Sequence, residues 1–153
     1  MQAVYNRVGG FYYLQILVKK LNIEIKKEKE FYLFGINTIL KDYQLCFLIN
    51  DFFSIETNLL NTENVEPELS VFGDILDETK VLLVQNRLCD GQFVFPKLKT
   101  FEYIVIVEDQ DYSVVDIVKS FETKDEILYI SQIDSKYIKN KNYNLINQLL
   151  AML

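Results

Sequence analysis

The segment Phe101–Val107 constrains the fold most, because its last four residues, Ile104–Val107, are all apolar. Alternate side chains of a strand point to opposite faces of the sheet. One face would carry Phe101, Tyr103, Val105 and Val107, and the other Glu102, Ile104 and Ile106. A strand that is apolar on both faces lies inside a sheet rather than at its edge. We therefore expect this segment to be a central strand.

Three further short apolar segments precede it and predict an antiparallel meander. They cover residues 70–76, 80–88 and 92–95 and are rich in Val, Ile, Leu and Phe. Asp77-Glu78-Thr79, Asp90-Gly91 and residues 96–100 separate the four segments, and Asp-Gly is a strong signal for a tight turn. Pro96 lacks a backbone N–H, so we expect it to end the strand 92–95.

The N-terminal third predicts a hairpin followed by a helix. Residues 12–25 and 31–36 have the composition of two strands that could pair. Residues 38–52 predict a helix with one apolar face, formed by Leu45, Leu48, Ile49 and Phe52. We expect Thr38 to cap this helix, because its hydroxyl can accept a hydrogen bond from a free backbone N–H.

The C-terminal part predicts a β-α-β unit and a last helix. Ser113 and Asp116 have the spacing of a capping box at the start of a helix over residues 113–121. A strand over 127–131 follows and completes the unit that begins with Tyr103–Val107. The last helix, 142–153, has one apolar face formed by Ile146, Leu149, Leu150 and Leu153. We expect it to pack on its own sheet, with docking on a partner helix as the alternative.

These elements predict a single α+β domain over residues 1–153. Its mostly antiparallel sheet would combine the N-terminal hairpin, the meander and the β-α-β unit, and would pack against two or three helices. A chain of 153 residues, 25% of them charged, suits one globular domain. Residues 1–18 could instead be a loosely attached extension, and we expect few long-range contacts for residues 1–10.

The absence of histidine excludes Ser-His-Asp and Cys-His catalysis and histidine-ligated metals. Cys46 and Cys89 are the only cysteines, and two thiolates cannot complete a four-ligand zinc site. Both lie in apolar stretches, so we expect reduced core thiols, with a disulfide between them left open. Glycine-rich phosphate-binding loops are also missing from the sequence.

One acidic cluster could bind a cation. Glu108, Asp109 and Asp111 lie between the predicted central strand and the following helix, where carboxylates could hold Mg²⁺ together with phosphate oxygens. The alternative, which we favour, is that they stabilise the start of that helix through its dipole. We interpret the second acidic group, Asp74, Asp77 and Glu78, as turn residues.

The net charge of −6 is a sum of opposed regions. Residues 1–50 carry seven basic and four acidic groups (+3), residues 51–134 six and 18 (−12), and residues 135–153 three and none (+3). An acidic chain is poorly suited to binding duplex nucleic acid. The lysines at 19, 20, 26, 27 and 29 lie near aromatic residues and could contact single-stranded RNA, although acidic residues dilute them.

Tyr43, Tyr103 and Tyr129 lie in or beside apolar segments, and we expect buried rings with satisfied hydroxyls rather than catalytic groups. The sequence has no apolar run of about 18–20 residues that could span a membrane. Residues 1–20 lack the uninterrupted apolar stretch and cleavage site of a signal peptide. We expect a cytoplasmic protein.

The predicted first helix and the strand before it resemble an uncharacterised bacterial family named IPExxxVDY. That family has a similar strand followed by a helix with the pattern found in Lys41–Asn50, which contains Tyr43. The resemblance extends over residues 21–141 and includes the later β-α-β segment.

The motif that names the family would fall at Phe95–Tyr103, with the sequence FPKLKTFEY. Pro96 and Tyr103 match, Glu102 replaces Asp, and Lys97 stands where the family has Glu. The resemblance implies structural rather than catalytic roles for Pro96, Glu102 and Tyr103, because the motif covers a buried strand and the turn before it. It implies a structural role for Tyr43 as well, within the first helix. It implies no activity.

The sequence thus favours a non-enzymatic protein-interaction domain without a cofactor, whose partner is an unknown protein or a second copy of the chain. A ligand or magnesium-phosphate site at residues 108–111 and weak RNA binding are the alternatives. If the last helix serves a partner, deleting residues 142–153 should change the oligomeric state more than the folding of the monomer.

Overall fold

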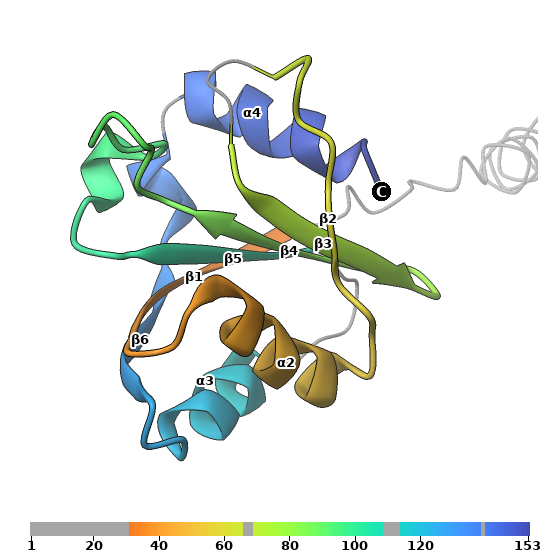
Figure 1. Ribbon diagram of the computed structural model, residues 1–153, viewed down its shortest axis with the longest axis vertical. Helices are drawn as coiled ribbons and strands as arrows, with labels where there is room; N and C mark the ends of the chain where they lie inside the picture. Colours follow the sequence, from red (N-terminus) through yellow and green to blue (C-terminus); the bar gives the residue numbers. More distant parts are fainter. Residues whose placement is uncertain (1–30, 66–68, 109–113, 139) are drawn as a thin grey trace, which may run out of the picture.

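The computed structural model describes residues 31–65, 69–108, 114–138 and 140–153, which form one sheet with helices on both faces (Figure 1). The strands are β1 (Phe31–Thr38), β2 (Asn58–Leu59), β3 (Val71–Leu76), β4 (Thr79–Gln85), β5 (Tyr103–Glu108) and β6 (Ile127–Ile133). The helices are α2 (Asp42–Phe53), α3 (Val114–Glu122) and α4 (Asn140–Leu150). The predicted α+β class is confirmed.

The six strands have the order β2-β3-β4-β5-β1-β6, and all neighbouring pairs are antiparallel. β5 is central, as predicted, with β4 on one side and β1 on the other. β5 and β6 run parallel to each other because both are antiparallel to β1, which lies between them. The predicted β-α-β unit is therefore present in a split form.

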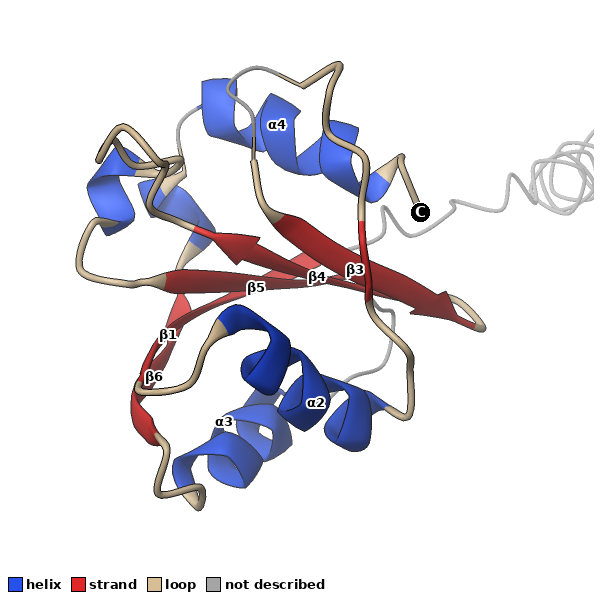
Figure 2. Cartoon of the chain, viewed as in Figure 1, coloured by secondary structure: helices blue, strands red, loops and turns tan. Residues whose placement is uncertain are grey.

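Each face of the sheet has its own apolar core, and Figure 2 shows α4 over one face and α2 with α3 over the other. Ile104 and Ile106 of β5 face α4, and Val105 and Val107 face α2 and α3. All four are at most 2% exposed. Phe101 departs from the predicted alternation: it packs on the α4 face whereas Tyr103 packs on the other, because β5 begins only at Tyr103.

The predicted strand over residues 92–95 is wrong. In the structure only an isolated bridge joins Phe93 to Arg87, on either side of a turn in which Gly91 has φ +85°. The prediction of a turn at Asp90-Gly91 is confirmed. Pro96 does not end a strand; it begins a 3₁₀ turn, Pro96–Leu98, where its missing N–H costs no hydrogen bond.

The first helix begins later than predicted, at Asp42, and Thr38 does not cap it. Thr38 is the last residue of β1, where its hydroxyl donates to the carbonyl of Glu126 (2.7 Å) and accepts from the N–H of Leu40 (3.1 Å). The predicted partner strand over residues 12–25 lies outside the described residues. β1 itself has β5 and β6 as its two neighbouring strands.

α4 packs on its own sheet. Ile146, Leu149 and Leu150 are at most 3% exposed and belong to the core between α4 and the sheet, and Leu153 packs against the same core beyond the end of the helix. None of the described helices combines the length and the apolar content that a membrane span requires.

Candidate functional site

The acidic cluster is described only in part. Glu108 ends β5, opposite Phe31 of β1 and Lys80 of β4, whereas Asp109 and Asp111 lie outside the described residues. Within the described ranges, no three His, Cys, Asp or Glu side chains come together as a metal site. Magnesium binding at residues 108–111 therefore stays a prediction.

The prediction of turn residues is right for Asp77 and Glu78, which lie in the turn between β3 and β4, and wrong for Asp74, which lies within β3. The Asp74 carboxylate accepts a hydrogen bond from the N–H of Glu56 (2.8 Å), which connects the end of α2 to β3. Asp77 has φ +54° in the turn between β3 and β4. Aspartate tolerates this conformation better than most residues, which explains its place there.

The motif residues Pro96, Glu102 and Tyr103 surround the start of β5. The carboxylate of Glu102 accepts from the N–H of Thr38 (3.2 Å), and the N–H of Glu102 donates to the side chain of Asn37 (2.9 Å). Both contacts join the segment before β5 to the end of β1. These contacts support a structural role for Glu102, because its carboxylate and its N–H both bond to the end of β1.

Asn86 organises the same segment, although it is not among the residues predicted from the sequence. Its side chain accepts from the N–H of Phe95 (2.9 Å) and donates to the carbonyls of Leu98 and Phe101 (2.9 Å each). Its backbone bonds to Glu102 and Val94 (2.8 Å each), and the residue is fully buried. An asparagine at the end of the apolar run KVLLVQ was the available signal, since a buried amide must find partners.

The expectation of buried tyrosines is wrong for Tyr43 and Tyr129, which are 52% and 56% exposed. Tyr43 lies on the outer side of α2, and the Tyr129 ring stacks on that of Phe101 at the surface (centroids 6.0 Å apart). Tyr103 is half-buried, and burial, with smaller effects of Asp42 and Glu102, raises its pKa.

The expectation for the cysteines is right for Cys46 and wrong for Cys89. Both are free thiols, but Cys46 lies on the buried face of α2, whereas Cys89 is exposed in the turn before Gly91. Burial raises the pKa of Cys46, with a smaller opposing effect of its hydrogen bond with Thr57. A buried thiol with a raised pKa is a poor nucleophile.

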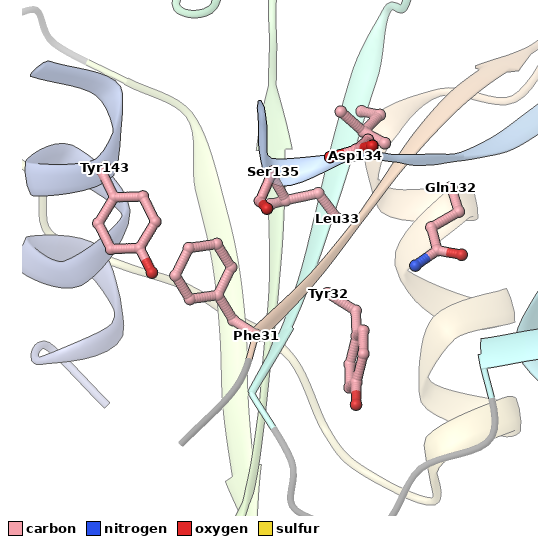
Figure 3. Close-up of a pocket in the computed structure, with 8 residues that line it drawn as sticks. Phe31, Tyr32, Leu33, Gln132, Asp134, Ser135 and Tyr143 are labelled. Atoms are coloured by element: carbon pink, nitrogen blue, oxygen red, sulfur yellow. The ribbon is translucent and has the colours of Figure 1, made fainter. Parts of the chain in front are cut away.

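A pocket of about 570 Å³ lies at one end of the sheet, where β1 begins and β6 ends. Figure 3 shows Phe31 and Tyr143 on one side of β1 and Tyr32 and Gln132 on the other. The rings of Phe31 and Tyr143 are 5.0 Å apart. The pocket is therefore aromatic on the side that faces α4.

The charged group of this pocket is already engaged. The Asp134 carboxylate accepts from the N–H of Lys136 (2.9 Å) and forms an ion pair with its ammonium group (3.0 Å). The backbone hydrogen bond, followed by the side-chain contact, lowers the pKa of Asp134. A carboxylate held ionised in this way is a weak general base.

No family model and no curated protein matches the chain.

A second concave surface of about 590 Å³, the α4 groove, lies between α4 and residues 88–97. Four apolar residues form its floor: Leu88, Phe93, Val94 and Leu145. Its rim carries Lys97 and Lys141, and among its described lining residues there is no carboxylate. The groove is thus apolar below and basic above.

The third candidate surface is the outer edge of β6. This strand is the last of the sheet that residues 31–65, 69–108, 114–138 and 140–153 form, and its sequence, ILYISQI, has no charge, proline or glycine. Leu128 and Tyr129 on it are 65% and 56% exposed. The described part of the chain therefore offers three candidate binding surfaces: the pocket where β1 begins, the α4 groove and the β6 edge.

Proposed function

We propose that the chain is a non-enzymatic protein-interaction domain whose β6 edge pairs with the β6 edge of a second copy. The observation that carries this proposal is an uncharged strand at the end of the sheet, which has β1 as its one neighbouring strand among the described residues. An unpaired strand has a row of free backbone groups that another strand can bind.

The hydrogen-bond pattern identifies which backbone groups of β6 point away from β1. The N–H of Asn86 donates to the carbonyl of Glu102, so in β5 the even-numbered residues bond to β4 and the odd-numbered ones to β1. By the same alternation, the backbone N–H and C=O groups of Leu33, Gly35 and Asn37 in β1 point toward β6. In β6 the backbone groups of Ile130 and Gln132 consequently point away from β1.

The two edges of the sheet differ in their protection. β2 is only two residues long, which limits pairing by a further strand. The pairing between β1 and β6 shifts register beside Thr38, so that Leu128 is an extra residue without a partner in the β1 register. Tyr129–Ile133 pair with β1 in regular register. That stretch is long enough for another strand to add to it.

A second copy of the chain can pair with this edge because the two facing β6 strands would carry no like charges. The chain has a net charge of −6, which disfavours contact between most of its surfaces. Ile127–Ile133 carries no charge, so two β6 strands can meet about a twofold axis without ionic repulsion.

The substitution Gln132→Pro tests the proposal. It removes an N–H that points away from β1, so the monomer keeps its sheet while the added strand loses a hydrogen bond. Gln132→Thr is the matched control, because it changes the same side chain and keeps the N–H. We expect the wild-type chain and Gln132→Thr to sediment as dimers at micromolar concentration and Gln132→Pro as a monomer. A wild-type monomer, or a dimer that survives Gln132→Pro, would exclude this mode of association.

We also propose that the chain belongs with the IPExxxVDY family. The contacts of Glu102 and the position of Pro96 in a 3₁₀ turn support structural roles for the motif residues.

A cytoplasmic location is proposed as well, supported by the exposed free thiol of Cys89, which a reducing compartment would preserve.

A further inference from the structure

We infer that the α4 groove binds an extended acidic peptide segment with apolar side chains. The inference is independent of β6, because the groove lies between α4 and the loop 88–97 and shares no residue with that strand. Its volume of about 590 Å³ is within the range of ligand-binding pockets.

The charge of the rim selects an anionic ligand. Lys97 and Lys141 are exposed, and the structure shows neither of them in an ion pair within the described residues. The central region of the same chain, residues 51–134, carries a net charge of −12. A lysine pair without carboxylates among its described neighbours is therefore a local exception on an acidic body, and it would attract acidic side chains.

The amides of the groove favour a peptide over other anions. Gln92, Asn142, Asn144 and Gln148 line it beside the lysines. Each side-chain amide both donates and accepts hydrogen bonds, as the backbone of an extended peptide requires. The apolar floor would take the apolar side chains of such a segment, whereas a nucleic-acid strand would need stacking rings and more cations.

The wall of the groove is held in place before any ligand binds. Val94 and Phe95 each donate an N–H to Asn86, and the amide of Asn86 donates to Leu98 on the far side of Pro96. These contacts fix the loop on both sides of Pro96. A preformed wall reduces the entropy that binding would otherwise cost.

Fluorescence anisotropy with labelled polymers tests the inference. The probe is a random copolymer of Glu and Tyr, which supplies acidic and apolar side chains. Poly-Glu and poly-uridine are the comparison probes. We expect saturable, salt-sensitive binding of the copolymer and weaker binding of both other polymers. Binding of poly-Glu as tight as that of the copolymer, tighter binding of poly-uridine, or no binding of the copolymer would overturn the inference.

Two double variants separate the groove from general charge attraction. Lys97→Glu/Lys141→Glu reverses the rim and should weaken copolymer binding at least about tenfold, because like charges then face the ligand. Lys119→Glu/Lys124→Glu makes the same change in net charge at exposed sites on and after α3, across the sheet. It should bind as the wild type does; an equal loss in both variants would show that the groove is not the site.

Discussion

The ring of Phe101 lies directly over Gly35, so a β-carbon added at Gly35 would overlap that ring. Gly35 lies in the middle of β1 and pairs with Ile104 of β5 and Ser131 of β6. The ring of Tyr129 continues this contact toward the sheet edge by stacking on Phe101. Glycine is required here because of the close approach of the ring.

Gly35→Ala should therefore destabilise the protein by about 1–3 kcal/mol, the usual cost of overpacking. Urea unfolding followed by circular dichroism measures the change. The double variant Gly35→Ala/Phe101→Ala is the control: removing the ring makes room for the methyl group, so the two effects should not add. Strictly additive free energies would contradict the contact.

Asn86→Ala should cost about 3 kcal/mol or more in the free energy of unfolding. The substitution leaves the N–H of Phe95 and the carbonyls of Leu98 and Phe101 without their partner, and unsatisfied buried groups are expensive. Asn58→Ala, which removes a single exposed hydrogen bond to Glu56, is the control and should cost less than about 1 kcal/mol. Equal costs at both sites would mean that Asn86 does not hold the loop.

Truncation of the apolar face of α4 should destabilise the monomer. Leu149 is fully buried, and Leu149→Ala should cost about 2–5 kcal/mol, whereas the exposed neighbour Asn147→Ala should cost little. The burial of this face favours a loss of folding, rather than a change of oligomeric state, when residues 142–153 are deleted. Thermal melts with light scattering on the same samples distinguish the two outcomes.

The two cysteines should react at very different rates. Native protein treated with iodoacetamide should be alkylated at Cys89 at least about tenfold faster than at Cys46, because Cys46 is buried and its pKa is raised. Peptide mass spectrometry at successive times gives both rates. In urea the rates should converge, and similar rates in native buffer would show that Cys46 is accessible.

Stability should fall as the solution becomes alkaline. Burial raises the pKa of Tyr103 and of Cys46, so the folded state retains these protons more tightly than the unfolded state. The ordinary pKa is 9.0 for Cys46 and 10.0 for Tyr103. The stability that each protonated group contributes is complete below its ordinary pKa and is lost as pH rises through its raised pKa in the folded state. Tyr103→Phe should therefore lose less stability than wild type between neutral pH and pH just above 10.0. Parallel losses would show that Tyr103 does not contribute.

The choice of elements was predictable where periodicity and burial agree. Ile104–Val107 was recognisable as central because a strand that is apolar on both faces must be covered on both. The apolar face of α4 was recognisable from the helical spacing of its leucines. The candidate surfaces were not predictable, because an open edge and a groove exist only once strands and helices have neighbours.

Local signals failed where distant residues compete for the same groups. Thr38 has the chemistry of a helix cap, but in the structure its hydroxyl donates to the carbonyl of Glu126 and accepts from the N–H of Leu40. Residues 92–95 have strand composition, yet the three side-chain hydrogen bonds of Asn86 hold this loop and the turn after it in another shape. Tyr43 and Cys89 lie in apolar sequence and are nevertheless exposed.

The sequence by itself determined the fold class, the central strand and the exclusion of histidine chemistry, since these depend on composition and local period. Only the tertiary structure decided that β1 separates β5 from β6, that β6 is the last strand of the described sheet, and that Lys97 and Lys141 line one groove. Strand order and shared surfaces arise from long-range pairing, and hydrophobic periodicity carries no information about which strands become neighbours.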